Sequence, residues 1–275
     1  MPWFPEFTSA LELARAKRRA AGQADPVGQY VAALTNADAR AWEMEWPGQV
    51  VVYDPRDGEV RGRRHLKQFV RRSHNWLAEH HARVETIAST VADGRALLEL
   101  MVHLSIEGRD LDWPVAVVAE SADDRSVVFR SYFSRKAIDG QPHLRPAVLR
   151  PGPVRGGDVV GRYHVAQGAG DAEAIVATFE SDGYYRGPAS AHCAYRGATE
   201  LRPFFERIFS SGGIGLEHCT VTDDGVRCAV EYNCLRWGPD DLTPQAGLGI
   251  YERGAAGLLA AVRVYDDVEP PATVR

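Results

Sequence analysis

The most constraining feature of this sequence is that it repeats itself. Val27-Gly28-Gln29-Tyr30 recurs as Val160-Gly161-Arg162-Tyr163, 133 residues later. Two further pairs keep the same order at nearly the same offset: Arg61-Gly62 with Arg196-Gly197, and Arg130-Ser131-Tyr132 with Arg263-Val264-Tyr265. Insertions and deletions in loops of a duplicated domain produce offsets that vary by one or two residues. The chain is therefore predicted to contain two copies of one fold.

The repeat divides the 275 residues into four predicted segments. Residues 1–23 are expected to be a helical extension, with a charged amphipathic helix over 6–21. The two copies are expected at 24–138 and 158–275. Residues 139–157 between them are rich in proline and glycine, which is typical of a linker. A chain of this length suits two small domains.

Each copy has the same predicted element order. In the first, apolar positions at helical spacing predict a helix over 26–39, followed by a β-branched strand over 49–53, a Pro-Gly turn and a second helix over 63–78. Four strands then follow, over 82–90, 95–106, 113–120 and 126–134. This order predicts an α+β fold, a curved antiparallel sheet wrapped on helices around a cone-shaped pocket. Because open sheet faces must be covered, the two copies are expected to pair as an intrachain pseudo-dimer.

Composition excludes several classes of function. The net charge is −5 and the pI is near 6.0, so the overall charge gives no reason to expect a nucleic-acid partner. No run of about 18 apolar residues and no leader peptide is evident, which predicts a cytoplasmic chain without a membrane partner. A small-molecule ligand is expected instead. The basic run from Arg61 to Arg72 leaves open an acidic carrier protein or a phosphate-bearing substrate as a partner. Further oligomerisation is also left open.

Cysteine and glycine patterns argue against a bound cofactor. The four cysteines lie in the second half at spacings that fit no zinc motif, so they are expected to be reduced and buried. No glycine-rich phosphate loop follows a predicted strand. We therefore expect neither a metal nor an organic cofactor. The cysteines are Cys193, Cys219, Cys228 and Cys234.

Two short motifs carry a resemblance to a known family. The sequence resembles the SnoaL-like and ketosteroid isomerase-like members of the NTF2-like superfamily at these motifs. The first is the predicted helix segment from Gln29 to Leu34, and the second is Val52-Tyr53-Asp54-Pro55 at the end of the next predicted strand. In that family a tyrosine at the Tyr30 position donates a hydrogen bond to the substrate oxyanion, and an aspartate at the Asp54 position is the general base. The resemblance covers both copies and implies tandem cone-shaped α+β barrels. It also implies cofactor-independent acid-base catalysis of the isomerase, polyketide cyclase, dehydratase (lyase) or epoxide hydrolase type.

This sequence departs from the family pattern at several positions. The family's second oxyanion donor, a protonated aspartic acid, falls near Ala116, so strict steroid isomerisation is not expected. In the second copy Tyr163 keeps the tyrosine, but the base position falls on Gly187 and the other acid position on Gly249. We therefore expect one active pocket, in the first copy, with the second copy as a structural partner. If the second pocket works, its base would come from Glu231 or Asp266.

Each candidate also has a structural alternative. Tyr30 could be a core tyrosine, and Asp54 could cap its own turn. Glu99, Met101 and His103 share one face of a strand by period two, and either face of that strand could line the pocket. A non-catalytic ligand-binding or assembly module is the rival function. The ligand-binding candidates are Trp42, Trp46, Tyr53, Glu99, Met101, His103, Trp113 and Tyr132.

Overall fold

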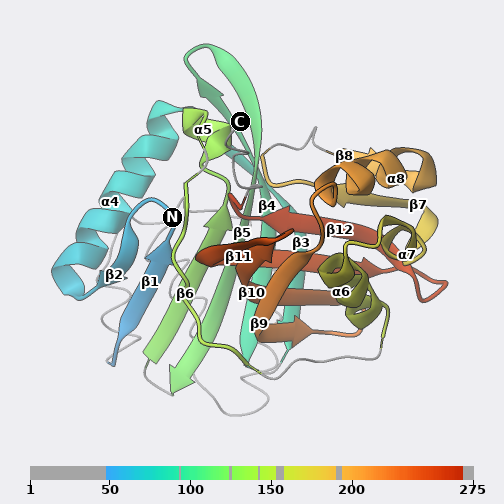
Figure 1. The fold of residues 1–275 in the computed structure, drawn as a ribbon. Coiled ribbons are helices and arrows are strands. Elements are labelled where there is room, and N and C mark those ends of the chain that lie inside the picture. Colours follow the sequence, from blue (N-terminus) through green and yellow to red (C-terminus); the bar gives the residue numbers. More distant parts are fainter. Residues whose placement is uncertain are drawn as a thin grey trace. The chain divides into compact units, whose positions relative to one another are not determined.

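The chain divides into two compact units, 1–133 and 134–275, in a computed structural model (Figure 1). The structure describes residues 48–92, 94–123, 126–141, 143–152, 158–189 and 194–268. The two predicted N-terminal helices lie outside these residues, as do Tyr30, Trp42, Trp46 and Cys193. The predicted intrachain pseudo-dimer stays a prediction.

Unit 1 is built on a six-stranded sheet with the order β2-β1-β6-β5-β4-β3. Strand β1 pairs in parallel with β6, and every other neighbouring pair is antiparallel. Helix α4 buries Leu66, Phe69, Val70 and Leu77, which recur at helical spacing. The bounds are β1 Val50–Asp54, β2 Gly58–Arg61, α4 Arg63–Glu79, β3 Arg83–Ala92, β4 Arg95–Ile106, β5 Arg109–Asp123 and β6 Ser126–Phe133.

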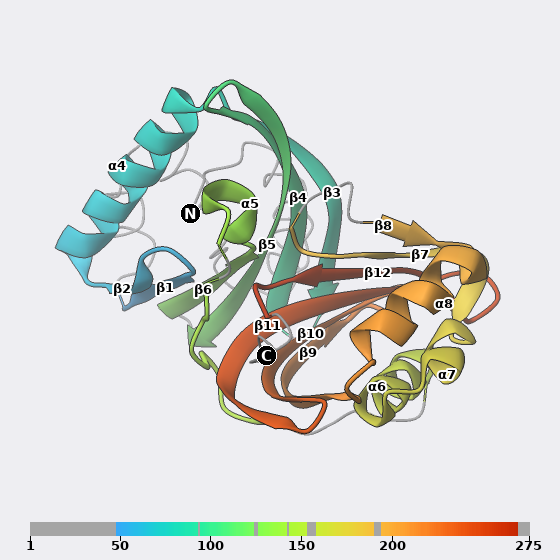
Figure 2. The same cartoon turned by 45° about the horizontal axis from the view of Figure 1, so that its top comes forward.

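Unit 2 repeats this sheet in the order β8-β7-β12-β11-β10-β9, again with one parallel pair, β7 with β12. Its helices α6, α7 and α8 gather on one side of the sheet in both views (Figures 1 and 2). The bounds are α5 Lys136–Asp139, α6 Val159–Ala169, α7 Ala172–Val176, β7 Phe179–Arg186, β8 Ala194–Arg196, α8 Gly197–Ile208, β9 Ile214–Asp223, β10 Arg227–Trp237, β11 Asp240–Arg253 and β12 Leu259–Tyr265.

Strand register shows which residues of the two units are equivalent. Tyr53 pairs with Arg130 in unit 1, and Arg186 pairs with Arg263 in unit 2. Because Arg130 and Arg263 are partners in the repeat, Arg186 is the counterpart of Tyr53. The predicted fold class is confirmed: two tandem α+β units share one sheet order, each with a curved, largely antiparallel sheet.

One predicted strand boundary was wrong. Strand β5 begins at Arg109 rather than at Trp113, because β4 and β5 pair as far as Ile106 opposite Arg109. The two residues between them, Glu107 and Gly108, have φ values of 51° and 76°. Two consecutive positive φ values are those of a tight two-residue hairpin turn, which lets the strands pair to their ends.

The repeat extends to a group of charged side chains across the sheet. In unit 1, Glu120 on β5 lies 3.2 Å from Arg95 on β4 and 2.8 Å from Arg130 on β6. In unit 2, Glu252 on β11 lies 3.4 Å from Arg227 on β10 and 2.9 Å from Arg263 on β12. We call each set an Arg–Glu–Arg triad. Each joins three consecutive strands, and in both the arginine on the last strand is buried.

Candidate functional site

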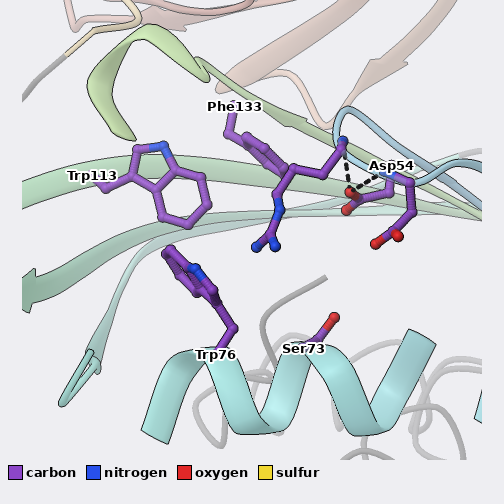
Figure 3. Close-up of a pocket in the computed structure, with 7 residues that line it drawn as sticks. Asp54, Ser73, Trp76, Trp113 and Phe133 are labelled. Carbon is purple, nitrogen blue, oxygen red and sulfur yellow. Dashed lines mark hydrogen bonds between the residues drawn. The ribbon is translucent and has the colours of Figure 1, made fainter. Parts of the chain in front are cut away.

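A small cleft in unit 1 brings together residues from the end of β1 and the turn after it, from α4, from β5 and from the end of β6 (Figure 3). Its free space is about 10 Å³, which holds about one water molecule. Polar and aromatic side chains both contribute to its wall. The lining residues are Asp54, Arg56, Asp57, Ser73, Trp76, Trp113 and Phe133.

Asp54 combines a structural role with a place in this cleft. Its side chain is 2% exposed. One carboxylate oxygen, Oδ1, accepts hydrogen bonds from the backbone N–H groups of Arg56 at 2.9 Å and Asp57 at 3.3 Å. This is an Asx turn, which the Asp-Pro sequence favours. Asp54 therefore caps its own turn, and the same bonds fix the position of its carboxylate in the cleft wall (Figure 3).

Three aromatic side chains form another part of the wall. Trp113 packs edge to face on Trp76, with ring centroids 5.8 Å apart, and on Phe133, at 4.7 Å. The Arg56 guanidinium carbon lies 4.9 Å from the centroid of the Trp76 ring, a cation–π contact. Sequence reasoning missed Arg56, Trp76 and Phe133. The spacing of Ser73 and Trp76, one helical turn apart, was a signal that both face the sheet.

Most predicted ligand-binding residues of unit 1 lie on the other face of the sheet. In the register Glu99 is opposite Ala116, and Ala116 is opposite Tyr132, so their side chains share one face. Trp113 differs from Ala116 by an odd number of residues and projects to the opposite face, toward the cleft. Met101, His103 and Tyr53 fall on the Glu99 face by the same alternation. The structure thus joins Asp54 with Trp113 and leaves the other described candidates away from the cleft.

His103 has partners of its own on that face. Its Nδ1 lies 2.6 Å from Asp112 Oδ1, and its Nε2 lies 3.4 Å from Glu85 Oε2. The imidazole thus bridges carboxylates on the neighbouring strands β5 and β3. This arrangement is a cross-strand ion-pair cluster on the face opposite the Asp54 cleft.

In unit 2 the interior acidic residue lies at the end of the neighbouring strand. The register places Gly187 at the Asp54 position and Asp266, which follows Tyr265, at the Phe133 position. Asp266 Oδ2 accepts a hydrogen bond from Tyr232 Oη at 2.5 Å, and Oδ1 accepts one from the backbone N–H of Val268 at 3.0 Å. Burial raises the pKa of Asp266 to about 6.

A strand glycine makes room for this pair. A Cβ placed on Gly247 would lie 2.4 Å from Tyr232 Cε2 and 2.5 Å from Asp266 Oδ2. Glu231, the other predicted acid, lies on the opposite face, where its carboxylate accepts a hydrogen bond from Thr220. Glu231 and Asp266 therefore do not form one site.

Tyr163 lies in the hydrophobic core of unit 2. Its ring packs edge to face on Tyr251, 5.2 Å between centroids, and on Phe179, at 6.0 Å. Burial raises the pKa of Tyr163 well above its usual value. The neighbouring His164 is hydrogen-bonded through Nε2 to Tyr251 Oη at 2.7 Å, and burial lowers its pKa to about 3, so the imidazole is neutral. These side chains are part of the hydrophobic core of unit 2.

The described residues contain no group of three or more His, Cys, Asp or Glu side chains that could hold a metal ion. Cys219, Cys228 and Cys234 are buried free thiols, as expected. Burial raises the pKa of both Cys228 and Cys234 to about 12, so neither is a reactive thiolate. In the same part of the chain no helix combines the length and apolar character needed to cross a membrane.

No family profile and no curated protein matches this chain. Several solved structures are similar in fold. A putative polyketide cyclase from Sinorhizobium meliloti is 17% identical over 38% of this chain and 92% of that chain, with a TM-score of 0.33. An NTF2-like protein of unknown function from Cytophaga hutchinsonii is 15% identical over 42% and 93%, with a TM-score of 0.32. An LEH-like epoxide hydrolase from M. tuberculosis is 19% identical over 39% of this chain and 78% of that chain, with a TM-score of 0.34. The name of the Cytophaga hutchinsonii protein carries the same NTF2-like term as the sequence resemblance.

Proposed function

We propose that unit 1 carries a cofactor-independent acid-base active site, with Asp54 as the base, for a small and largely apolar ligand. The reaction would be an isomerisation, cyclisation, dehydration or epoxide opening. The observation that carries the proposal is the Asp54 carboxylate, held by its own turn in a cleft that Trp76, Trp113 and Phe133 also line. A fixed carboxylate among aromatic rings can remove a proton from carbon or from an attacking water.

Such a reaction also needs a group that stabilises the negative charge developing on oxygen. The family resemblance assigns this role to Tyr30. In the described cleft, Arg56 supplies a permanent positive charge from the same turn as Asp54. Its guanidinium can donate hydrogen bonds to an enolate or an opening epoxide oxygen while Asp54 holds the proton.

Ligand entry requires a local rearrangement. The free space suffices for about one water, so a ligand must displace the Arg56 side chain from the Trp76 ring. Arg56 is exposed and lies in a turn, where a side chain can change rotamer without moving the sheet. The proposal therefore includes an Arg56 side chain that swings outward as the ligand enters.

Two small probes test the proposal without knowledge of the natural substrate. Cyclohexanone in D₂O reports α-proton exchange by NMR, and styrene oxide reports epoxide opening through diol formation. We expect wild-type protein to accelerate one of them and Asp54→Asn to lower that rate at least about a hundredfold. Asp112→Asn, the same change on the opposite sheet face, is the matched control and should keep the rate. Equal rates in wild type and Asp54→Asn would contradict the proposal.

The second candidate function is a non-catalytic binding module. The capping bonds favour it, because Oδ1 of Asp54 already accepts two hydrogen bonds from its turn. On this alternative Asp54→Asn lowers the free energy of unfolding, and neither probe reacts faster than in buffer with any variant. Chemical denaturation beside the two rate assays separates the functions.

A further inference from the structure

Arg186, the last residue of β7 in unit 2, is a buried arginine with two guanidinium nitrogen atoms that lack a hydrogen-bond partner among the described residues. Its side chain is 4% exposed. Within the described residues, its Nε and Nη2 atoms are fully buried and make no hydrogen bond. Its guanidinium carbon lies 4.6 Å from the centroid of the Tyr265 ring. That cation–π contact stabilises the charge but satisfies none of the N–H groups.

Acceptors near Arg186 are engaged by other arginines. Arg186 pairs in the sheet with Arg263, which places two like charges side by side. Arg263 donates to Glu252 at 2.9 Å and to Tyr184 Oη at 3.2 Å. Glu252 also accepts from Arg227. The unit 2 triad is therefore complete without Arg186.

Comparison with unit 1 shows that Arg186 is an addition to the shared frame. Both units have an Arg–Glu–Arg triad at the same strand positions, but the counterpart of Arg186 in unit 1 is the uncharged Tyr53. A buried cation with no acceptor is strongly unfavourable for folding. Binding of an anion to Arg186 would explain why the protein has a buried arginine at this position.

The positions of Nε and Nη2 indicate the shape of anion that Arg186 can bind. Nε–H and one Nη2–H point in parallel from the same edge of a guanidinium. Two parallel donors match the two oxygens of a planar carboxylate, which accepts both in a bidentate pair. We propose that Arg186 binds the carboxylate of a small-molecule ligand, at a site in unit 2 separate from the Asp54 cleft.

Thermal unfolding with sodium formate as the probe tests this site. Anything that binds only the native state raises the midpoint of unfolding in a saturable way. We expect formate, compared with sodium chloride at equal ionic strength, to do so for wild type. Arg186→Met should lose the formate response, with at least a tenfold weaker apparent affinity. Arg202→Met, at an arginine of α8 that pairs with Glu173 in solvent, is the matched control and should keep the wild-type response.

Other outcomes would overturn the assignment. Equal formate responses in wild type and Arg186→Met would mean an adventitious ion only. Saturation by inorganic phosphate at lower concentration than formate would assign the site to a tetrahedral anion. Absence of any saturable response in wild type would remove the site altogether.

A second measurement covers the case in which Arg186→Met does not fold. In protein labelled with ¹⁵N-arginine, the Nε–H signal of Arg186 is the one missing from Arg186→Lys, which retains the positive charge. On addition of formate this signal should shift, and its exchange with water should slow. If no arginine Nε–H signal changes, the proposal fails.

Discussion

The two units share one sheet order but carry their interior carboxylates at the ends of different, neighbouring strands. In unit 1 Asp54 ends β1 and Phe133 ends β6, whereas in unit 2 the same positions are Gly187 and Asp266. The unit 1 carboxylate borders a cleft, and the unit 2 carboxylate is packed against Tyr232. The comparison teaches that the sheet order and the triads were kept in both copies, while the interior acidic residue and its surroundings diverged.

The largest expected effect tests which carboxylate does chemistry. Asp266→Asn should leave the probe reaction within about twofold of wild type, in contrast to the loss of about a hundredfold or more expected for Asp54→Asn. The reason is that Asp266 is hydrogen-bonded to Tyr232 and is not among the residues that line the Asp54 cleft. The rate assays with cyclohexanone and styrene oxide measure both variants. Loss of activity in Asp266→Asn alone would place the active site in unit 2.

The next effect concerns pH and the stability of unit 2. Asp266 has a pKa of about 6 in the folded protein, above the usual 3.8, because burial disfavours its charge. The folded state therefore binds a proton that the unfolded state releases between these values. The free energy of unfolding should fall by about 3 kcal/mol as pH rises from about 4 to 6.

Urea denaturation from pH 4 to pH 8 measures this decline. Asp266→Asn should flatten the profile, because its side chain does not titrate. Tyr232→Phe removes the hydrogen bond that lowers the pKa of Asp266, so its decline should continue to higher pH than in wild type. Profiles of the same slope for wild type and Asp266→Asn would show that another group is responsible.

A smaller effect is expected from filling the space beside this pair. Gly247→Ala puts a methyl group 2.4 Å from Tyr232 and 2.5 Å from Asp266, and the strands must shift to accept it. We expect a loss of about 1–3 kcal/mol in the free energy of unfolding. Gly168→Ala is the control, because its added Cβ would meet no atom nearer than 4.0 Å. Equal stabilities of the two variants would show that the interior of unit 2 is loosely packed.

The smallest expected effect tests the assignment of sheet faces in unit 1. His103→Asn breaks contacts with Asp112 and Glu85 on the face opposite the cleft. These partly exposed pairs contribute little, so stability should change by less than about 1 kcal/mol. The probe rates should stay within about twofold of wild type. A large loss of rate would place His103 in the active site after all.

Sequence reasoning could predict the fold because the repeat and the element order are local patterns. It could also predict Asp54, because the Asp-Pro turn at the end of a strand is a local signal. It missed Trp76 and Phe133 because these residues meet Asp54 only after the sheet closes around α4. It missed Arg56 because turn chemistry defines the backbone and not where the side chain points. The roles of Tyr30, Trp42 and Trp46 stay predictions.

The interchangeable triads have a consequence for how the chain folds. Glu252 of the second copy has the same charge and the same register position as Glu120 of the first. During folding, Arg95 could therefore pair with either glutamate. The triads therefore do not distinguish a strand from its duplicate, and strand exchange between copies is the misfolding route to which tandem repeats are prone. Discrimination must come from interior positions where the copies differ, such as Gly247 opposite Tyr232 where unit 1 has Val115 opposite Leu100. Packing at those residues then favours pairing of each strand within its own sheet.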